Sequence, residues 1–502
     1  MLNELDKLTN NNGGVTTLTE NGALTLATSG SKCLDLFSSI GAWRGRDDGY
    51  IIKHFAEAFN EDKLLAMRIL FYTRDVRGGL GERRVFRILL KWLAENCPEA
   101  LRPNLMYVPF FGRFDDLWDL LDTELCPEVI AMIKQQLDMD LENLKAEKPI
   151  SLLGKWLPSS NTSSKQSVRH ANKIAKKLGW KISDYRKTVS KLRRAIDIVE
   201  TRICRALEID FPKLPGQALK RYTKLFFRRY EESFNAYLES VNKGEAKMNA
   251  DTLLPCDIVH KLLTERWSKR WDEMSQEEIG ALDTMWKQLP DFTNSGNNIA
   301  VVDVSGSMFC HGSGIAPIDV SVSLGLYFAE HNTGCFRGTM LTFSAKPKLV
   351  FVKGSNIKQK VENCTNLEWG GNTDIKAVFD VILQAALNKK AKPEEMPQTI
   401  YIISDMEFDD CTSNADVTNY ELAKCTYARY GYKLPGVVFW NVDSRNSQVP
   451  VAKDEIGTAL VSGYTPRLFG MIFSVLEKTP MDIMLEIIGT ERYQRITVGT
   501  AS

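Results

Sequence analysis

The chain has 502 residues, of which 44% are hydrophobic and 25% charged, and its net charge is +1. These values are typical of a globular protein with enough chain for two to four domains. No apolar run approaches the roughly 20 residues that span a bilayer, and the N-terminus lacks the basic and apolar regions of a secretory signal. Ten cysteines without a CxxC pair exclude a zinc-ribbon pattern and indicate reduced thiols. We therefore expect a cytoplasmic protein with no membrane partner.

The first half of the sequence is predicted to be helical after an N-terminal arm. Residues 1–48 begin with a polar stretch rich in Asn, Thr, Gly and Ser, and an extended, partly ordered arm is expected there. Apolar residues then recur at helical spacing in the segments 50–76, 82–97, 115–123, 128–148, 167–179, 182–207, 218–244 and 256–267. Successive helices without strands favour a bundle or a HEAT-like solenoid over 49–292, although the sequence shows no repeat of fixed period.

From about residue 296, short apolar runs alternate with helical segments. Strands are predicted at 298–304, 338–344, 348–352, 399–405 and 436–442, and helices at 318–332, 374–390 and 420–431. This alternation is typical of an α/β fold with a doubly wound, Rossmann-like parallel sheet. The polar stretch 290–297 marks the boundary with the helical part. The α/β domain is expected over 296–480, and residues 481–502 are expected to form a C-terminal tail.

Oxygen-bearing side chains stand at the ends of predicted strands or in the loops between them. Asp303, Ser305 and Ser307 stand in "DVSGS", Thr373 in "GGNTD" and Asp405 at the end of "IISD". Ligands of such sheets lie beyond the carboxyl ends of the strands, so these residues are expected to converge. Hydroxyl and carboxylate oxygens suit a hard cation such as Mg²⁺, or alternatively Mn²⁺ or Ca²⁺. A D-x-S-x-S pattern alone also fits serines that cap the next helix.

The complete set of five resembles the metal-ion-dependent adhesion site of von Willebrand factor A domains. The resemblance implies that the three hydroxyl groups lie near the metal and that the two carboxylates contribute directly or through water. It also implies a protein partner, or another anionic ligand, that donates a carboxylate to the metal. The match covers roughly 295–480. It departs from many family members at Asn372, just before the threonine, and this could shift the loop.

Catalysis is not expected at this site, and no catalytic residue is predicted. An aspartyl phosphatase needs a second acid two positions after the nucleophile, where this chain has Ser305. A serine hydrolase needs a histidine base, and the histidines of this half, His311 and His331, lie in no recognisable setting. A metal-dependent nuclease would need a second cage of close carboxylates.

The near-zero net charge hides a strongly basic stretch. Residues 151–230 contain 20 Lys and Arg against 5 Asp and Glu, an excess of 15 in a chain whose total is +1. An excess of this size is the electrostatic footprint of a polyanion. Aromatic residues between the cations could stack on unpaired bases, although at helical spacing they fit a core better. No helix-turn-helix, zinc finger or basic zipper is recognisable, so structured or single-stranded RNA is favoured over duplex DNA.

The candidate RNA contacts are chosen by charge alone. They are Lys155, Lys165, Arg169, His170, Lys173, Lys176, Lys177, Arg186, Lys187, Arg193, Arg194, Lys220, Arg221, Lys224, Arg228 and Arg229. The polar segment 159–170, "SSNTSSKQSVRH", adds a basic loop suited to phosphate contacts.

Most of the chain resembles the Ro ribonucleoprotein family, in which a helical TROVE module precedes a von Willebrand factor A domain. The segments that carry this resemblance are 71–93 and 107–121, while 19–47 and 152–164 are more similar to uncharacterised TROVE-like proteins of bacteria and phages. The resemblance implies binding of small structured RNAs on the outer helical surface and of single-stranded ends in a central hole. It also implies a location in the cytoplasm, or in a host cytoplasm or virion for a phage protein.

A second hypothesis for the function is a scaffold, associated with a phage or virion, that uses the A domain for protein–protein binding. The glycines of "DVRGGLGER" (75–83) are interpreted as a helix stop and a tight turn. A phosphate-binding loop would need a following Lys-Ser/Thr, which this segment lacks.

Overall fold

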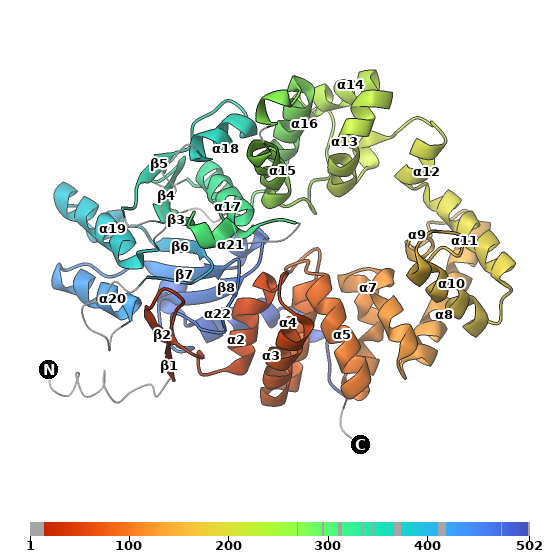
Figure 1. Cartoon of the computed structure of the whole chain (residues 1–502), viewed down its shortest axis with the longest axis horizontal. Coiled ribbons are helices and arrows are strands. Elements are labelled where there is room, and N and C mark those ends of the chain that lie inside the picture. Colours follow the sequence, from red (N-terminus) through yellow and green to blue (C-terminus); the bar gives the residue numbers. More distant parts are fainter. Residues whose placement is uncertain are drawn as a thin grey trace.

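The computed structural model describes residues 15–268, 270–293, 296–309, 314–333, 335–343, 346–365, 373–409, 418–472 and 474–499. A helical N-terminal region is followed by a C-terminal domain built on a mixed sheet with parallel strands, which confirms the predicted order of a helical part and an α/β part. The helices follow a curved path that leads away from the sheet and returns to it (Figure 1). Within the described ranges, no helix is both long and apolar enough to cross a membrane.

The first described residues pack onto the rest of the molecule. β1 (Thr16–Leu18) and β2 (Leu24–Leu26) form an antiparallel hairpin, and α2 (Lys32–Ser39) follows. The Ser31 hydroxyl begins α2 by accepting a hydrogen bond from a backbone N–H of its first turn. The apolar face of α2 is buried against β7 and β8. The predicted arm over 1–48 is therefore wrong for this part, because a short amphipathic helix follows the polar stretch.

The helical region contains more and shorter helices than predicted. They are α3 (Asp48–Glu61), α4 (Lys63–Arg74), α5 (Arg84–Asn96), α6 (Pro98–Leu101), α7 (Val108–Phe111), α8 (Cys126–Lys145), α9 (Leu153–Trp156), α10 (Lys165–Lys177), α11 (Ile182–Ile196), α12 (Val199–Cys204), α13 (Gly216–Arg229), α14 (Glu231–Asn242), α15 (Pro255–Trp267) and α16 (Gln276–Lys287). The predicted helix at 115–123 is a 3₁₀ helix, Phe114–Asp122.

Three segments predicted as continuous helices are each divided in two. Asp62 separates α3 from α4, and its carboxylate accepts a hydrogen bond from the N–H of Leu65 to begin α4. Asp197 ends α11 in the left-handed conformation, with φ of 55°, which a right-handed helix cannot continue. α13 ends and α14 begins at Tyr230. Each half of these segments buries apolar residues, so the apolar spacing in the sequence does not mark the breaks.

The C-terminal domain is built on six strands in the order β5-β4-β3-β6-β7-β8. They are β3 (Asn298–Asp303), β4 (Thr339–Phe343), β5 (Leu349–Phe351), β6 (Thr399–Ser404), β7 (Gly436–Asn441) and β8 (Thr458–Ser462). Neighbours are parallel except β4 and β5, so the prediction of a wholly parallel sheet is wrong at this edge. The connection at 344–348 is too short for a parallel crossover, which takes about a dozen residues. No strand is predicted from the sequence at the position of β8.

Helices follow most of these strands along the chain. They are α17 (Pro317–His331), α18 (Ile357–Thr365), α19 (Ile375–Lys389), α20 (Asn419–Arg429), α21 (Arg467–Met471), α22 (Pro480–Ile488) and α23 (Glu491–Gln494). Every residue of β3 and of β7 is buried. This is the pattern expected of strands covered on both faces.

The helical region contacts the C-terminal domain at both of its ends, so that the chain forms a closed ring (Figure 1). At one end α2 packs on β7, β8 and α22, and at the other end α15 packs on α17 and α16 on α18. The predicted C-terminal tail is wrong, because α22 and α23 pack against α2 and α4. Arg492 of α23 forms an ion pair with the buried carboxylate of Asp75, which also accepts a hydrogen bond from the Tyr493 hydroxyl at 2.9 Å.

The glycines after Asp75 have the structural role that their spacing suggests. A Cβ atom on Gly79 would lie 2.1 Å from the carbonyl oxygen of Tyr72, so this position excludes any larger residue. Gly81 has a φ of 72°, a conformation that favours glycine. The segment therefore forms the tight turn that positions Asp75 for the C-terminal helix.

Candidate functional site

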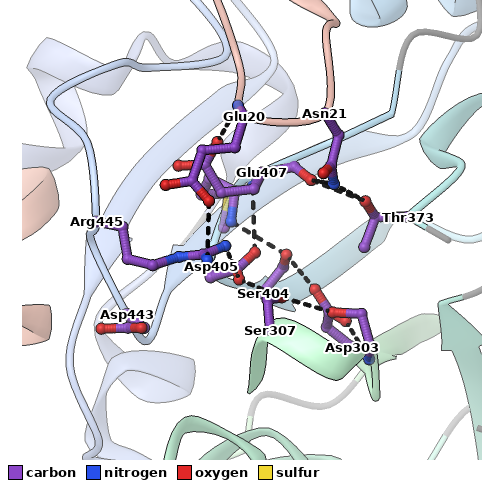
Figure 2. A network of polar contacts seen from close by, with 12 residues as sticks. Glu20, Asn21, Asp303, Ser307, Thr373, Ser404, Asp405, Glu407, Asp443 and Arg445 are labelled. Carbon is purple, nitrogen blue, oxygen red and sulfur yellow. Dashed lines mark hydrogen bonds and ion pairs between the residues drawn. The ribbon is translucent and has the colours of Figure 1, made fainter. Parts of the chain in front are cut away.

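Four of the five predicted metal-site residues meet where β3 and β6 end (Figure 2). β3 ends at Asp303, and Asp405 directly follows its parallel neighbour β6. The Ser305 and Ser307 hydroxyl oxygens are 3.0 Å apart, and the Ser307 hydroxyl donates to Asp405 Oδ2 at 2.7 Å. Asp303 is joined to the same cluster through Ser404, whose hydroxyl donates to its Oδ2 at 2.5 Å. Both carboxylates and Ser305 are buried.

The spacing of these oxygens fits a small hard cation. Two ligands that bind Mg²⁺ at about 2.1 Å along perpendicular directions lie about 3 Å apart. The separations from Ser307 to Ser305 and to Asp405 are of that size. Among the described residues, no group of three or more His, Cys, Asp or Glu is placed to hold a metal, so a site here depends on hydroxyl oxygens. Residues 303, 305, 307 and 405 therefore fit the predicted donor set.

The surroundings of Asp303 disfavour the negative charge of its carboxylate, and a nearby cation would offset this effect. Burial, and after it the nearby charge of Asp405, together raise the pKa of its carboxyl to about 7. Hydrogen bonds from Ser404 and from the backbone N–H of Ser305 act against this rise without cancelling it. Two buried carboxylates so close together favour a positive charge between them.

Thr373 is turned toward a different set of partners. Its hydroxyl donates to the carbonyl oxygen of Glu407 at 2.8 Å, and its backbone N–H donates to Asp409 Oδ2 at 2.7 Å. The next residue, Asp374, begins α19 by accepting a hydrogen bond from the N–H of Ala377. Thr373 thus borders the cluster through the segment after β6 and is not hydrogen-bonded to the other four predicted residues. The rest of its loop, residues 366–372 with Asn372, lies outside the described residues.

The tip of the β1–β2 hairpin lies over this edge of the sheet (Figure 2). The Asn21 amide nitrogen donates to the carbonyl oxygen of Glu407 at 2.7 Å and contacts the Thr373 hydroxyl at 3.3 Å. The Thr19 hydroxyl donates to the carbonyl oxygen of Phe408 at 2.6 Å, and the N–H of Glu20 donates to Glu407 Oε2 at 2.8 Å. Residues near the start of the chain therefore cover the candidate site.

Arg445, in the loop after β7, bridges the hairpin and the cluster. Its guanidinium donates to Asp405 Oδ2 at 2.7 Å and forms an ion pair with Glu20 at 2.9 Å. Burial lowers the pKa of Arg445, but the charges of Asp405, Glu20 and Glu407 outweigh this and raise it. The guanidinium supplies positive charge to the Asp405 oxygen that Ser307 also contacts, so Arg445 would compete with any cation for this carboxylate.

Most of the predicted RNA contacts on α10, α11 and α13 are exposed. Some are neutralised by carboxylates: Arg169 and Lys173 share Asp122, Lys220 pairs with Asp257, and Lys224 lies 3.8 Å from Glu278. Besides Arg193, the predicted cations with no carboxylate partner among the described residues are Lys155, Lys165, Lys176, Lys177, Arg186, Lys187, Arg194, Arg221, Arg228 and Arg229.

Two of the predicted RNA contacts have structural roles instead. His170 is buried among the apolar residues of α10, and burial lowers the pKa of its imidazole. The Arg193 guanidinium donates to the carbonyl oxygens of Gly154 and Leu157, at 3.1 and 2.6 Å, and to the Ser159 hydroxyl at 2.8 Å. All of its nitrogens are thus occupied in holding the 154–159 segment against α11. Charge alone does not distinguish such residues from exposed ones.

Family models match nearly the whole chain. One described as "Domain of unknown function (DUF2828)" matches residues 19–123 and 123–296, and one described as "Domain of unknown function (DUF7788)" matches 297–490. The chain belongs to the DUF2828 family. An uncharacterized protein of Acanthamoeba polyphaga mimivirus is 31% identical over 508 residues, which cover 94% of this chain and 86% of that protein.

Among solved structures, the Ro (RSR) protein of Deinococcus radiodurans aligns over 92% of this chain and 100% of that one. The two chains are 13% identical in this alignment, and the TM-score is 0.48. A likeness of this size assigns neither a fold nor a function to this chain.

The DUF2828 match and the structure divide the chain at nearly the same place. The match ends at residue 296, and β3 begins the sheet at Asn298. It starts at residue 19, at the tip of the hairpin. The hairpin tip thus belongs to the DUF2828 part, while Asp405 and Arg445, which it covers, belong to the part that the other model matches. The candidate site is completed by residues from both.

Proposed function

We propose that this DUF2828 protein binds RNA without acting on it as an enzyme, and that its sheet edge holds a divalent cation. The observation that carries the RNA part is the set of exposed cations on α10, α11 and α13 that have no carboxylate partner among the described residues. Unpaired surface cations contribute little to folding. They are the groups that replace counterions on a nucleic acid backbone.

The salt dependence of binding tests this proposal directly. A small structured RNA and an unstructured RNA are titrated with the full-length protein by fluorescence anisotropy at several concentrations of NaCl. Six phosphate contacts predict a slope of log K against log salt of about −5 for a duplex stem and about −4 for a single strand. A slope near zero would overturn the RNA proposal. The same holds if the protein binds RNA no more tightly than bovine serum albumin binds it.

The cation part of the proposal supposes a site like that of von Willebrand factor A domains. Ser305, Ser307 and Asp405 would hold the ion, with Asp303 acting through Ser404, Ser305 or water. Such an ion would supply an electron-poor centre that attracts a carboxylate oxygen from a protein partner. The raised pKa of Asp303 and the oxygen spacing around Ser307 support this proposal.

Binding of Mn²⁺, followed by the loss of its free-ion electron paramagnetic resonance signal, tests the cation site without an activity assay. Asp405→Asn and Ser307→Ala are expected to weaken Mn²⁺ binding at least tenfold, because each removes a candidate oxygen ligand. A tenfold change in affinity corresponds to about 1.4 kcal/mol. Ser462→Ala is the matched control, since Ser462 ends β8 at the same edge and contacts Gly41 and Phe37 instead. Equal binding by all three variants would reject the site.

The local geometry at Asp303 supports a binding role over a catalytic one. Its side chain is fully buried, and its two oxygens accept hydrogen bonds from Ser404 and from the N–H of Ser305. A nucleophile or general base must reach the reacting atom. A labelled RNA incubated with the protein and Mg²⁺ is therefore expected to stay intact, and cleavage that Asp405→Asn abolishes would contradict this.

A further inference from the structure

An open groove of about 650 Å³ runs along the exposed face of α11. One wall is a polar face of that helix, where Ser183, Arg186, Lys187, Ser190 and Arg194 recur at helical spacing. The other walls are the 158–161 loop and the region of α12, including Thr201 and Arg205. A volume of this size takes a ligand of a few hundred daltons, so it suits a short stretch of one strand and not the face of a duplex.

The groove is lined by cations without any carboxylate. Arg186, Lys187, Arg194 and Arg205 are exposed, and none forms an ion pair with a described residue. The remaining lining is mostly hydroxyl and amide groups from serine, threonine and asparagine. Such a surface has an unbalanced positive potential and many hydrogen-bond donors, which together favour an anion with several oxygens.

A second groove of the same volume, about 650 Å³, shows that this charge pattern is not general. It lies between α3, α5 and the 3₁₀ helix and contains four cations, but each has a carboxylate partner. The pairs are Arg83 with Asp115, Arg84 with Asp48, Arg87 with Asp119 and Lys91 with Glu95. Because this second groove has the same volume but its cations are neutralised, it serves as a control for the groove on α11.

The floor of the α11 groove is held rigid before any ligand arrives. Arg193 ties the 154–159 segment to α11 through three hydrogen bonds, and the Tyr185 hydroxyl donates to the carbonyl oxygen of Pro158 at 2.9 Å. The hydroxyl oxygen of Ser160 is buried there without a hydrogen-bond partner among the described residues. An orphaned polar atom of this kind is costly unless a ligand or water completes its hydrogen bonds.

We infer that this groove binds the sugar-phosphate backbone of single-stranded RNA; this inference rests on the proposed RNA-binding function and assigns it a place. Guanidinium groups match phosphate oxygens, and hydroxyl groups match the ribose 2′-hydroxyl. The aromatic ring of Tyr185, which lines the groove, is buried and so offers no face for stacking of bases. Recognition here is therefore independent of base sequence.

The test compares two triple variants that change the net charge equally. Arg186→Gln/Lys187→Gln/Arg194→Gln removes three cations from the α11 groove, and Arg84→Gln/Arg87→Gln/Lys91→Gln removes three from the control groove. Each is titrated with labelled 12-nucleotide oligouridylate by fluorescence anisotropy at several NaCl concentrations, and circular dichroism checks folding. The α11 variant is expected to bind about thirtyfold more weakly, with a salt slope about 2 units shallower, since each phosphate contact in a single strand contributes about 0.7. The control is expected to change affinity less than threefold.

Each outcome decides between the inference and the broader proposal. If the wild-type protein binds no RNA, the proposed function fails and this inference fails with it. If the wild type binds RNA and both triple variants weaken it equally, RNA binding stands and the α11 groove is rejected. If oligoglutamate of 12 residues competes as well as oligouridylate, the groove is a site for acidic protein segments instead.

A crosslinking measurement covers the case in which a variant does not fold. Oligouridylate with 4-thiouridine is irradiated in complex with the wild-type protein, and the modified peptides are identified by mass spectrometry. Crosslinks are expected within 158–161 and 183–205. Crosslinks confined to other segments would overturn the assignment.

Discussion

The sheet edge and the α11 groove hold their polar groups in opposite ways. At the sheet edge, Asp303, Asp405 and Glu407 are buried, and each accepts hydrogen bonds from neighbouring groups. In the groove, Arg186 and Lys187 are exposed and have no carboxylate partner among the described residues. Buried, fully bonded groups contribute to the stability of the fold, whereas exposed unpaired charges contribute to binding. Substitutions should therefore lower stability in the first region and affinity in the second.

The largest effect is expected from Asp303→Ala. This change leaves the Ser404 hydroxyl and the N–H of Ser305 buried without an acceptor, and it should lower the free energy of unfolding by about 3 kcal/mol. Lys187→Gln, in the groove, should change it by less than about 0.5 kcal/mol. Urea denaturation followed by tryptophan fluorescence measures both.

Asp303→Asn sharpens this result. Because burial and the charge of Asp405 raise the pKa of Asp303, a neutral side chain of the same shape removes repulsion while keeping an acceptor. It should lower the free energy of unfolding by less than about 1 kcal/mol. A loss as large as that of the alanine variant would show that the removed repulsion does not offset the one acceptor oxygen that the amide group lacks.

Arg445→Gln should affect cation binding about tenfold, in the direction of tighter binding. The guanidinium supplies positive charge to Asp405, so its removal leaves this carboxylate to the ion, and a gain of about 1.4 kcal/mol is a tenfold change. Titration with Mn²⁺ by electron paramagnetic resonance measures the affinity. Glu20→Gln is the control, because it breaks the outer half of the bridge and leaves the contact between Arg445 and Asp405 in place. Weaker Mn²⁺ binding by Arg445→Gln would contradict the competition.

The sequence predicts the strands of the sheet edge better than the site built on it. β3, β6 and β7 are continuous apolar runs, and the rule that ligands lie beyond strand ends brings Asp303 and Asp405 together. The same rule could have indicated Arg445, which follows β7 at the same edge. No local pattern indicates Glu20 or Asn21, because their partners are more than 350 residues away in the sequence.

In the basic helices α10, α11 and α13, the sequence predicts the candidate binding region better than the contacts of its residues. Their charge excess is a property of composition and is visible in the sequence, but the partner of each cation is not. Lys173 and Lys177 are one turn apart on α10, and only the fold places Asp122 beside the first of them. The burial of His170 and the three hydrogen bonds of Arg193 likewise depend on tertiary packing that the local sequence does not show.

A pair of double variants on α10 tests whether pairing decides which cations bind RNA. Lys176→Gln/Lys177→Gln removes two cations without carboxylate partners, and Arg169→Gln/Lys173→Gln removes the two that share Asp122. Since paired cations release fewer counterions, the first variant should weaken binding of oligouridylate about fivefold and the second about twofold or less. Fluorescence anisotropy at one fixed ionic strength measures both. Equal losses would mean that regional charge, and not the individual partners, sets the affinity.

The smallest effect is expected between the two regions. Figure 1 shows α10 and α11 on the part of the ring farthest from β3 and β6, and α11 packs on α8, α9 and α10. Fields between exposed charges fade over a Debye length of about 8 Å at physiological salt. Asp405→Asn should therefore leave the affinity for RNA within about twofold of the wild-type value. Mg²⁺ is kept in solution during this measurement, because removing it would also remove Mg²⁺ from the RNA.

A tenfold change in RNA affinity for Asp405→Asn would require about 1.4 kcal/mol of coupling through the ring. The route would have to cross one of the two junctions between the helices and the C-terminal domain. The α2 junction lies next to the hairpin that Arg445 holds, and the α15–α17 junction lies on the other side of the sheet. Comparing Glu20→Gln with a substitution on α15, such as His260→Gln, which removes the imidazole that contacts Asp319, would identify the junction. Loss of the coupling in only one variant would assign the route to that junction.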